Sequence, residues 1–383
     1  MQRTGKQLKS VSTSRLPFID FARGIAMVLM AWDHVSGFWN PGHQGSEGLM
    51  GRRPVFQDFT QFMLRFITHY CAPTFIFLAG TSLALSTAKR ASTGESQRNI
   101  SLRMIKRGTA LLLFGVFVES PAFGLSPLYF GVISCIGLCF IIFSVYNRLP
   151  SIAILALSVL IIVAHPFLNL IWIPNDNSGG WYLRVIIHEP SFDRYPFDGL
   201  YPIIPWIGVM GLGWVFGKFL STYDTTRTRR LMIPLAAGGA ASLGSWFVVR
   251  FFNGYGNLLP RLGNTLEDWL YMSKYPPDLA FLLWTLGGTC LFLALGLLLQ
   301  GRPSFDRGVA GAILTFGTVP LFFYLTHLWL YRLRPGWMLR APFQLDLATT
   351  TALWLVGLLI LWRLSIRYEK LKREHPNSLL QYI

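Results

Sequence analysis

The stretch that decides the fold is Arg15-Leu-Pro-Phe-Ile-Asp20-Phe-Ala-Arg23-Gly24-Ile-Ala-Met-Val-Leu-Met-Ala-Trp-Asp33-His34. Its length and apolar content are typical of a membrane-spanning helix, yet it carries four ionisable side chains after Arg15. A charged group inside a bilayer costs from ~2.5 to over ~10 kcal/mol, so such groups usually face a cavity. At ~100° per residue, Asp20, Arg23 and His34 lie within about 60° on one face, with Asp33 about a quarter-turn away. We therefore expect a polar stripe along one membrane helix.

The rest of the chain has the composition of a membrane protein. Of its 383 residues, 52% are hydrophobic and 14% are charged, which excludes a disordered chain and is unusual for a soluble enzyme. Apolar runs long enough to cross ~30 Å of hydrocarbon recur along the whole length. We expect about ten spans, at residues 17–37, 60–87, 108–122, 128–147, 150–173, 201–221, 232–252, 277–300, 312–332 and 347–364. The predicted fold is an all-α, polytopic integral membrane helix bundle.

The net charge of +16 is distributed in a way that reports topology. With the amino terminus inside, 22 of the 34 Lys and Arg residues fall on inner segments and ten on outer loops and rims. This bias predicts that both termini are cytoplasmic and that the basic surface meets the lipid bilayer, not a nucleic acid. We predict a basic N-terminal segment over 1–15, a single transmembrane domain over 16–365 and a basic tail over 366–383. The chain shows no organelle signal, so the expected location is a bacterial inner membrane.

The cysteines give no sign of a metal centre. All four lie inside apolar spans and form neither a disulfide framework nor a paired ligand spacing (Cys71, Cys135, Cys139 and Cys290). We therefore expect no metal. The sequence does not fix the oligomeric state, and a homodimer is left open as a partner.

Polar side chains gather at one depth of the predicted bundle. With helix 1 running outward, helix 2 inward and helix 9 outward, His34, His69 and His327 share the outer half of the membrane, with Asp33 beside the first. Pro73 cannot donate to the carbonyl of His69, so we expect the second span to be distorted there. Three further residues mark the outer starts of helices 6 and 8: Trp206, Lys274 and Tyr275. A lone buried histidine is usually structural, but three at similar depth beside an Asp favour a functional site.

Histidine suits acyl transfer. A neutral imidazole can attack a thioester or take a proton from an accepting amine or hydroxyl near neutral pH. Adjacent residues on one helix point in different directions, so Asp33 is expected to serve a histidine on a neighbouring helix, such as His69. The Asp20/Arg23 pair has two readings, a structural salt bridge or part of a site for a phosphorylated donor.

Five blocks in order carry a family resemblance. They are Ile19-Asp20-x-x-Arg23-Gly24 with Met30 and Asp33-His34; Ile67-Thr68-His69-Tyr70-Cys71-Ala72-Pro73 running to Gly80; Ile204-Pro205-Trp206-Ile-Gly208; Lys274-Tyr275-Pro276-Pro277; and Pro320-Leu-Phe-Phe-Tyr324-Leu-x-His327. On these residues the chain resembles bacterial membrane proteins grouped with the heparan-α-glucosaminide N-acetyltransferase catalytic domain, within a superfamily of transmembrane acyltransferases.

The resemblance implies a reaction and a set of roles. Acyl-CoA, in particular acetyl-CoA, would be used from the cytoplasmic side, and the acyl group would pass to a sugar amine or hydroxyl of a glycan on the outer side. We expect His34 with Asp33 to be catalytic, assisted by His69, while His43 lies near the position of the family's catalytic histidine. The residues expected to line the acceptor site are His327, Lys274, Tyr275 and Trp206, with His43 in reserve. Asp20, Arg23 and Arg107 are expected at the CoA site.

Two other functions stay open at this point. Intramembrane Asp and His residues also form proton relays, so the chain could be a proton-coupled transporter. It could also be a non-catalytic member that binds a lipid or glycan. The first predicts substrate flux that responds to a pH gradient, and the second predicts ligand binding unaffected by His34→Ala.

Overall fold

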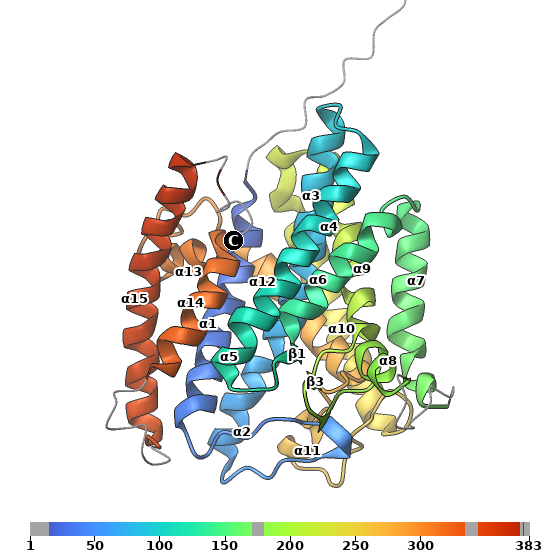
Figure 1. Ribbon diagram of the computed structural model, residues 1–383, viewed down its shortest axis with the longest axis vertical. Coiled ribbons are helices and arrows are strands. Elements are labelled where there is room, and N and C mark those ends of the chain that lie inside the picture. Colours follow the sequence, from blue (N-terminus) through green and yellow to red (C-terminus); the bar gives the residue numbers. More distant parts are fainter. Residues whose placement is uncertain (1–14, 171–179, 334–343, 376–377, 379–383) are drawn as a thin grey trace, which may run out of the picture.

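The computed structural model describes residues 15–170, 180–333, 344–375 and 378 and shows a predominantly helical bundle (Figure 1). Its longer helices are α1 (Pro17–Trp39), α2 (Phe59–Phe66), α3 (Cys71–Ser92), α4 (Gln97–Phe114), α6 (Val132–Tyr146), α7 (Ser151–Ala164), α8 (Gly180–Ile187), α9 (Ile203–Thr222), α10 (Met232–Phe252), α12 (Leu279–Leu299), α13 (Gly308–Thr318), α14 (Pro320–Arg332) and α15 (Leu347–Glu374). The shorter ones are η1 (Leu49–Gly51), η2 (Ile67–Tyr70), η3 (Gly115–Glu119), α5 (Ser120–Phe123), η4 (His165–Leu170), η5 (Thr225–Leu231) and α11 (Leu266–Leu270). The all-α membrane class is thus confirmed.

The number of spans is smaller than ten when length and composition are both required. Within the described residues, six helices are long and apolar enough to cross a membrane, and seven if the pair α13–α14, bent by 100°, is one span. Three of the expected spans do not meet the length and composition criteria, each for a different reason. Helix α1 has 23 residues but carries Asp20, Arg23 and Asp33. The run at 108–122 continues the amphipathic α4 into the turn η3, and α6 has only 15 residues.

Glycines let the central helices approach closely. Helix α1 lies between α3, α12, α13, α14 and α15. A Cβ atom at Gly24 of α1 would lie 1.9 Å from the carbonyl oxygen of Ile313 in α13, and one at Gly213 of α9 would lie 1.9 Å from that of Phe77 in α3. Neither position tolerates a side chain without moving a helix. Small residues at helix interfaces are how membrane helices pack, because lipid provides no hydrophobic driving force between them.

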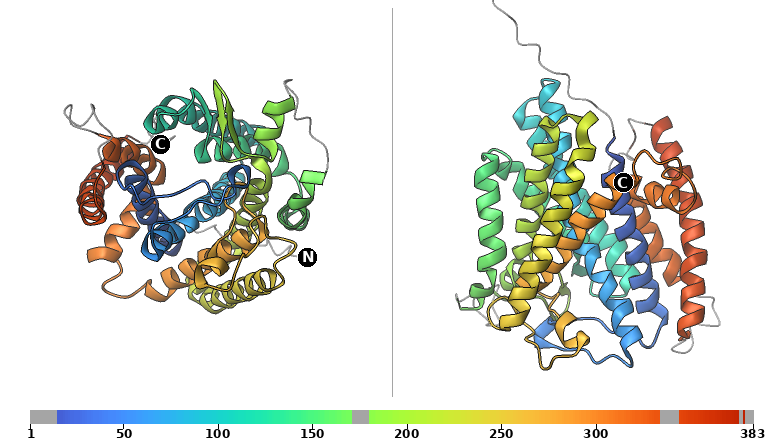
Figure 2. Two further views of the ribbon diagram at one scale, coloured as in Figure 1. Left: turned by 90° about the horizontal axis from the view of Figure 1, so that it is seen from below. Right: turned by 180° about the vertical axis from the view of Figure 1, so that it is seen from behind.

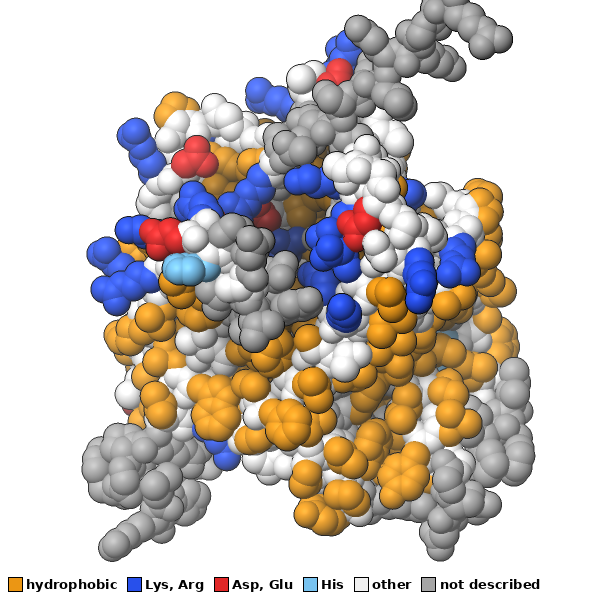
Figure 3. Space-filling model, turned by 45° about the horizontal axis from the view of Figure 1, so that its top comes forward, with side chains coloured by type: hydrophobic (Ala, Val, Ile, Leu, Met, Phe, Trp, Pro, Cys, Tyr) orange, Lys and Arg blue, Asp and Glu red, His pale blue; other side chains and the backbone are white. Residues whose placement is uncertain are grey.

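The two ends of the bundle differ in charge. Figure 1 shows that α1 begins and α15 ends at the same end, and Figure 2 shows the same arrangement from behind. Lys and Arg side chains gather there (Figure 3), so we name it the basic end. The opposite end, which we name the loop end, carries the segment 40–58 and α11 (Figure 1). Helix α15 continues to Glu374, so the first part of the expected tail over 366–383 is helical. The expected N-terminal segment 1–15 lies outside the described residues except for Arg15.

A small sheet that the sequence did not predict lies in the half of the bundle nearer the loop end (Figure 1). Its strands are β1 (Leu128–Phe130), β2 (Ser191–Arg194) and β3 (Phe197–Gly199), in the order β1-β3-β2. Strand β3 pairs parallel with β1 and antiparallel with β2. The sheet therefore joins the α5–α6 connection to the segment before α9, beside the polar residues described next.

Candidate active site

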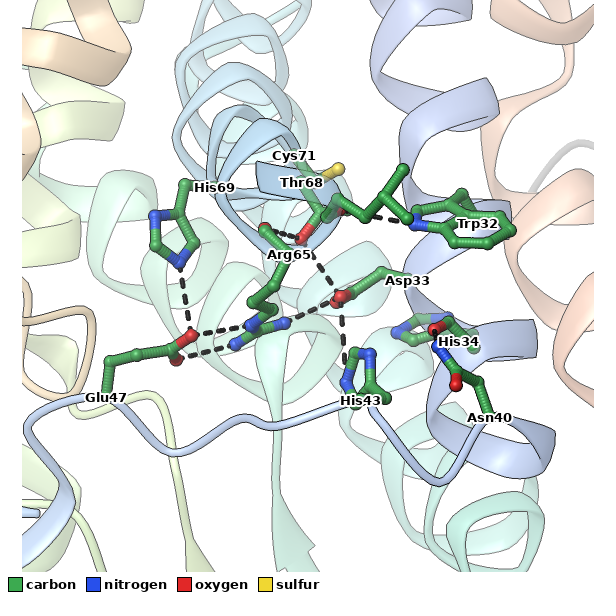
Figure 4. Close-up of polar contacts among 12 residues, drawn as sticks. Trp32, Asp33, His34, Asn40, His43, Glu47, Arg65, Thr68, His69 and Cys71 are labelled. Carbon is green, nitrogen blue, oxygen red and sulfur yellow. Dashed lines mark hydrogen bonds and ion pairs between the residues drawn. The ribbon is translucent and has the colours of Figure 1, made fainter. Parts of the chain in front are cut away.

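The end of α1 that lies at the loop end presents Asp33 to the second span. The Asp33 Oδ1 atom accepts hydrogen bonds from Arg65 Nη1 at 2.6 Å and from Thr68 Oγ1 at 2.9 Å (Figure 4). Arg65 closes α2, and Thr68 lies in η2, a 3-10 turn between α2 and α3. This turn is the distortion that Pro73 predicts near His69. It turns both side chains toward α1, so the carboxylate is fixed from two positions of one neighbouring span.

Arg65 is held between two carboxylates. Its Nε and Nη2 atoms donate to Glu47 Oε1 and Oε2 at 2.7 and 2.8 Å, while Nη1 binds Asp33. Arg65 and Glu47 are both buried. Burial would raise the pKa of the Glu47 carboxyl, but the Arg65 guanidinium holds this pKa well below its ordinary value. The pair therefore anchors the segment 40–58 to the membrane helices in charged form.

Sequence reasoning missed Glu47 as a functional residue. It lies in an irregular segment, 18 residues from Arg65, with no pattern that connects the two. Arg65 offered a signal, because it is a charged residue within a predicted span and needs a partner.

His69 and His43 have partners that the sequence did not predict. The His69 Nε2 atom lies 3.4 Å from Glu47 Oε1, and no contact joins His69 to Asp33. The expectation that Asp33 serves His69 is therefore wrong; it is His43 of the following loop that comes within ion-pair distance, with Nε2 4.0 Å from Asp33 Oδ1 (Figure 4). Burial, opposed by the attraction of Asp33, lowers the pKa of His43 to about 4. His43 is thus a neutral imidazole at physiological pH.

His34 is joined to His327 of α14. Their Nδ1 and Nε2 atoms, respectively, lie 2.7 Å apart, and the rings stack with centroids 5.0 Å apart. His327 Nδ1 lies 3.0 Å from the Phe323 carbonyl, which can only accept, so this nitrogen carries the proton. His327 Nε2 must then accept from His34 Nδ1–H. The remaining His34 nitrogen, Nε2, is left with a free lone pair.

Aromatic and basic residues from the predicted acceptor site lie together at the loop end. Lys274 is 2% exposed, and its Nζ lies 5.2 Å from the ring centroid of Tyr275. The backbone N–H groups of both residues donate to the Glu47 carbonyl, which ties them to the same segment 40–58. The Tyr201 ring bridges Tyr275 and Trp206, with centroids 5.6 Å from each. The indole N–H of Trp206 is buried and has no hydrogen-bond partner among the described residues.

The residues expected at a CoA site lie toward the basic end. Asp20 forms ion pairs with Arg15 and Arg23, at 3.1 Å each, so it acts within a salt-bridge network. Arg23 also donates to the Gly317 carbonyl and to Ser82 Oγ. Arg23 and Arg107 line one cavity of about 290 Å³, which Asp20 does not line.

This basic-end cavity has three basic residues in a largely apolar lining. Its lining comprises Arg23, Met27, Phe75, Leu78, Ala79, Ser82, Leu83, Arg107, Leu111, Val132, Ile133, Ile136, Phe140, Pro320, Leu321, Tyr324 and Lys372. Tyr324 links the cavity to the histidine pair, because its ring centroid lies 6.3 Å from that of His34 and 5.5 Å from that of His327. The Tyr324 hydroxyl oxygen and Glu119 Oε1 are hydrogen-bonded at 2.5 Å. Glu119 was not singled out from the sequence, where it stood at the edge of a short and broken apolar run.

Within the described residues, no group of three or more His, Cys, Asp and Glu is placed to hold a metal ion. The arrangement comprises a largely apolar cavity with basic residues in its lining, a histidine pair next to Tyr324 of that lining, and a charged cluster toward the loop end. Such a set can bind an anionic, elongated molecule and move protons near neutral pH. It defines a polytopic membrane protein with the groups that an acyl-transfer enzyme needs.

Comparison with known proteins identifies the family. Residues 15–251 match the family model described as heparan-alpha-glucosaminide N-acetyltransferase, catalytic. A stretch of 142 residues is 28% identical to the heparan-alpha-glucosaminide N-acetyltransferase of Mus musculus, and it covers 35% of this chain and 19% of the mouse protein. The chain belongs to this family of membrane acetyltransferases, as its sequence blocks predicted. The comparisons favour a transferase over the proton-coupled transporter.

Proposed function

We propose that this protein moves an acyl group, acetyl in the first instance, from cytoplasmic acyl-CoA to a sugar amine or hydroxyl at the outer face of a bacterial inner membrane. The observation that carries the proposal is the basic-end cavity. It joins Arg107 and Lys372 to Tyr324, and the Tyr324 ring contacts His34 and His327. A thioester inserted from the basic end would thus reach the histidine pair without leaving the protein.

The two ends of the cavity suit the two ends of acyl-CoA. Arginine binds phosphate through charge-assisted hydrogen bonds, and Arg107 is exposed where the cavity opens. A second cavity of about 150 Å³ adjoins it and is lined by Arg90, Arg103 and Arg107. These arginines would hold the phosphates of the nucleotide. The apolar wall would hold the pantetheine arm.

His34 is the general base in this proposal. Its Nε2 lone pair is available because Nδ1–H is donated to His327. The acceptor nitrogen or oxygen forms a bond to the acyl carbon and gives its proton to His34 Nε2, the carbon–sulfur bond breaks, and the electron pair leaves on the CoA sulfur, which becomes the thiol on protonation. Asp33, with His43, is placed to orient the acceptor. His69 acts through Glu47 and the anchoring of the loop.

The acceptor would lie among the aromatic residues of the loop end. Trp206 and Tyr275 offer ring faces, and the unpartnered indole N–H of Trp206 offers a donor. Lys274 adds a buried ammonium near Asp33 and His34. A sugar presents both hydroxyl groups and apolar C–H faces, which matches this mixture of groups.

CoA release from acetyl-CoA tests the proposal. Purified protein in nanodiscs would be compared with His34→Ala, His69→Ala and His43→Ala, using a panel of amino sugars and glycans as acceptors. His375→Ala is the matched control, since His375 is exposed beyond α15. We expect release by the wild type and the control, with the largest loss in His34→Ala. Absence of both turnover and saturable acetyl-CoA binding in the wild type would contradict the proposal.

A further inference from the structure

Glu119 is a buried carboxyl group in an unusual position. It ends η3, a single π-helical turn between α4 and α5, and its exposed fraction is 1%. Turns of this kind are frequent at functional sites. The Oε1 atom contacts the Tyr324 hydroxyl, and the backbone N–H of Ile133 also interacts with the carboxyl, whereas Oε2 has no hydrogen-bond partner. The carboxyl is therefore only partly satisfied.

The surroundings of Glu119 do not suit a charged carboxylate. Among the described residues, none provides a cation within salt-bridge distance of it. The titratable groups that face it are Tyr324 of α14 and Tyr129 of β1, with His34 of α1 beyond Tyr324. A Cβ atom at Gly131 would lie 2.7 Å from Oε2, so the backbone closes the carboxyl in on that side. A carboxylate deprived of water and of a counter-ion is costly, and a neutral carboxylic acid avoids that cost.

We propose that Glu119 is a neutral carboxylic acid that donates its proton to the Tyr324 oxygen, and that it thereby turns the Tyr324 hydroxyl proton into the basic-end cavity to bind the thioester oxygen. The 2.5 Å contact between Glu119 Oε1 and the Tyr324 oxygen fits donation in either direction. Only the neutral acid frees the phenolic proton, because a carboxylate would capture it. Glu119 is thus a positioning residue, and Tyr324 is the catalytic residue that touches the donor.

This inference rests on the proposed function, because it assigns the group that stabilises the thioester. As the acceptor attacks, negative charge develops on the acyl oxygen, and a fixed hydroxyl donor in a dry cavity stabilises it. No proton is transferred in this role, so the proton balance of the reaction is unchanged. His34 receives the proton of the acceptor on the other side of the Tyr324 ring.

The experiment combines turnover with a direct reading of protonation. Wild type, Tyr324→Phe and Glu119→Gln would be assayed for CoA release from pH 6 to pH 10, with Tyr331→Phe as control. Tyr331 is a buried tyrosine of the same helix whose hydroxyl donates to the Trp354 carbonyl, and it does not line the cavity. Infrared difference spectra of wild type against Glu119→Gln would show the C=O stretch of a protonated carboxyl.

The expected results separate the proposal from a structural role. Tyr324→Phe should lower kcat about 10²- to 10³-fold with acetyl-CoA affinity little changed, while Tyr331→Phe stays near the wild type. Glu119→Gln can still donate to Tyr324 and should keep most of the activity. The wild type should lose activity as Glu119 ionises at high pH, and Glu119→Gln should lack this alkaline limb. The protonated C=O band should be present in wild type only.

Three results would overturn the proposal: no protonated carboxyl at Glu119 at neutral pH, equal turnover in both tyrosine variants, or the same alkaline limb in Glu119→Gln. Failure of the proposed function itself looks different. In that case the wild type releases no CoA with any acceptor, which removes the role of Tyr324, while the infrared band still decides the state of Glu119.

Discussion

Each end of α1 carries an aspartate paired with an arginine, but the two pairs are arranged differently. At the basic end, Arg23 meets Asp20 three residues away on its own helix, and its other contacts are the Gly317 carbonyl and Ser82 Oγ. At the loop end, Arg65 binds Asp33 across 32 residues and Glu47 across 18. The contacts of the first arrangement lie within α1 and between α1 and the helices packed against it. The second holds together two helices and a loop, with His34, His43 and His69 around it, so it fixes the geometry of the loop-end site.

The comparison shows how buried charge is used in this membrane protein. In the local pair, Asp20 and Arg23 neutralise each other's charge. Arg23 also lines the basic-end cavity, where it can contact a ligand. A long-range network instead fixes groups that would otherwise move independently. Each partner in it is needed, because removing one leaves a charge buried without compensation.

The largest effect is expected from removing the centre of the loop-end network. Arg65→Met leaves the buried Glu47 and the partly buried Asp33 without their cation, and breaking a buried pair typically costs about 3–5 kcal/mol. We expect a large fall in the thermal unfolding temperature in detergent and complete loss of CoA release. Arg23→Met should cost less, because Arg15 still pairs with Asp20. Equal losses of stability in the two variants would show that the two ends do not differ as described.

The next largest effect is expected on the rate of the reaction, with the stability of the protein unchanged. His34→Ala removes the proposed base but no ion pair, and general-base catalysis is worth about 10²- to 10⁴-fold in rate. We expect CoA release to fall by a factor in this range, with the unfolding temperature close to that of the wild type. His43→Ala should lower the rate less, because His43 is 4.0 Å from Asp33 and has no contact with the histidine pair. A larger loss in His43→Ala would transfer the role of base to that residue.

The same contrast explains what could be predicted from the sequence. The stripe on α1 and the Asp20/Arg23 pair follow from helical spacing, which is a local property. The helix distortion near His69 follows from Pro73, also locally. The partner of Asp33 does not follow, since the path of the segment 40–58 decides that His43 and not His69 lies beside it.

Long-range partners were missed for one physical reason. Glu47 and Glu119 each sit outside regular α-helix, one in a loop and one in a π-helical turn, and their contacts depend on where distant helices lie. Their residue types alone carry no signal of this. The small sheet was also not predicted, because strands of three and four residues are too short to show an alternation of apolar and polar residues. The count of about ten spans stays a prediction, since six or seven helices of the described residues meet the length and composition required and apolar runs alone do not reveal a π-helical turn such as η3.

A smaller effect is expected at the mouth of the basic-end cavity. Arg107 is exposed, and exposed charge pairs contribute little, so Arg107→Ala should raise the KM for acetyl-CoA about five-fold at most and leave kcat unchanged. Arg98→Ala is the matched control, because Arg98 is an exposed arginine of the same helix that does not line the cavity. A change in kcat with unchanged KM would place Arg107 outside the donor site. Equal effects in both variants would indicate a general surface charge effect.

The smallest expected effect is on the pH dependence of stability. It distinguishes the contribution of His43 from those of the neighbouring carboxylates. Burial lowers the pKa of His43 to about 4, against about 6.5 for an unfolded chain. Between these values the unfolded chain binds more protons than the folded one, so the stability that His43 contributes is present above about pH 6.5 and is lost as the pH falls toward 4. His43→Gln, which cannot be protonated, should therefore show a shallower fall in unfolding temperature over this window.

Glu47 loses its stabilising contribution at a lower pH than His43 does, so the measurement can distinguish the two residues. Its pKa is held well below the ordinary value, so its stabilising contribution is present above about pH 4.5 and is lost only as the pH falls through that lower folded pKa. Between pH 6.5 and pH 4.5, then, the part of the stability loss that His43→Gln removes should come from His43 and not from the Arg65 network. If His43→Gln and wild type follow the same curve there, His43 takes up its proton at the same pH in the folded and the unfolded chain, and burial does not keep the imidazole neutral in this window. The loop end would then gain a cation beside Asp33 below about pH 6.5.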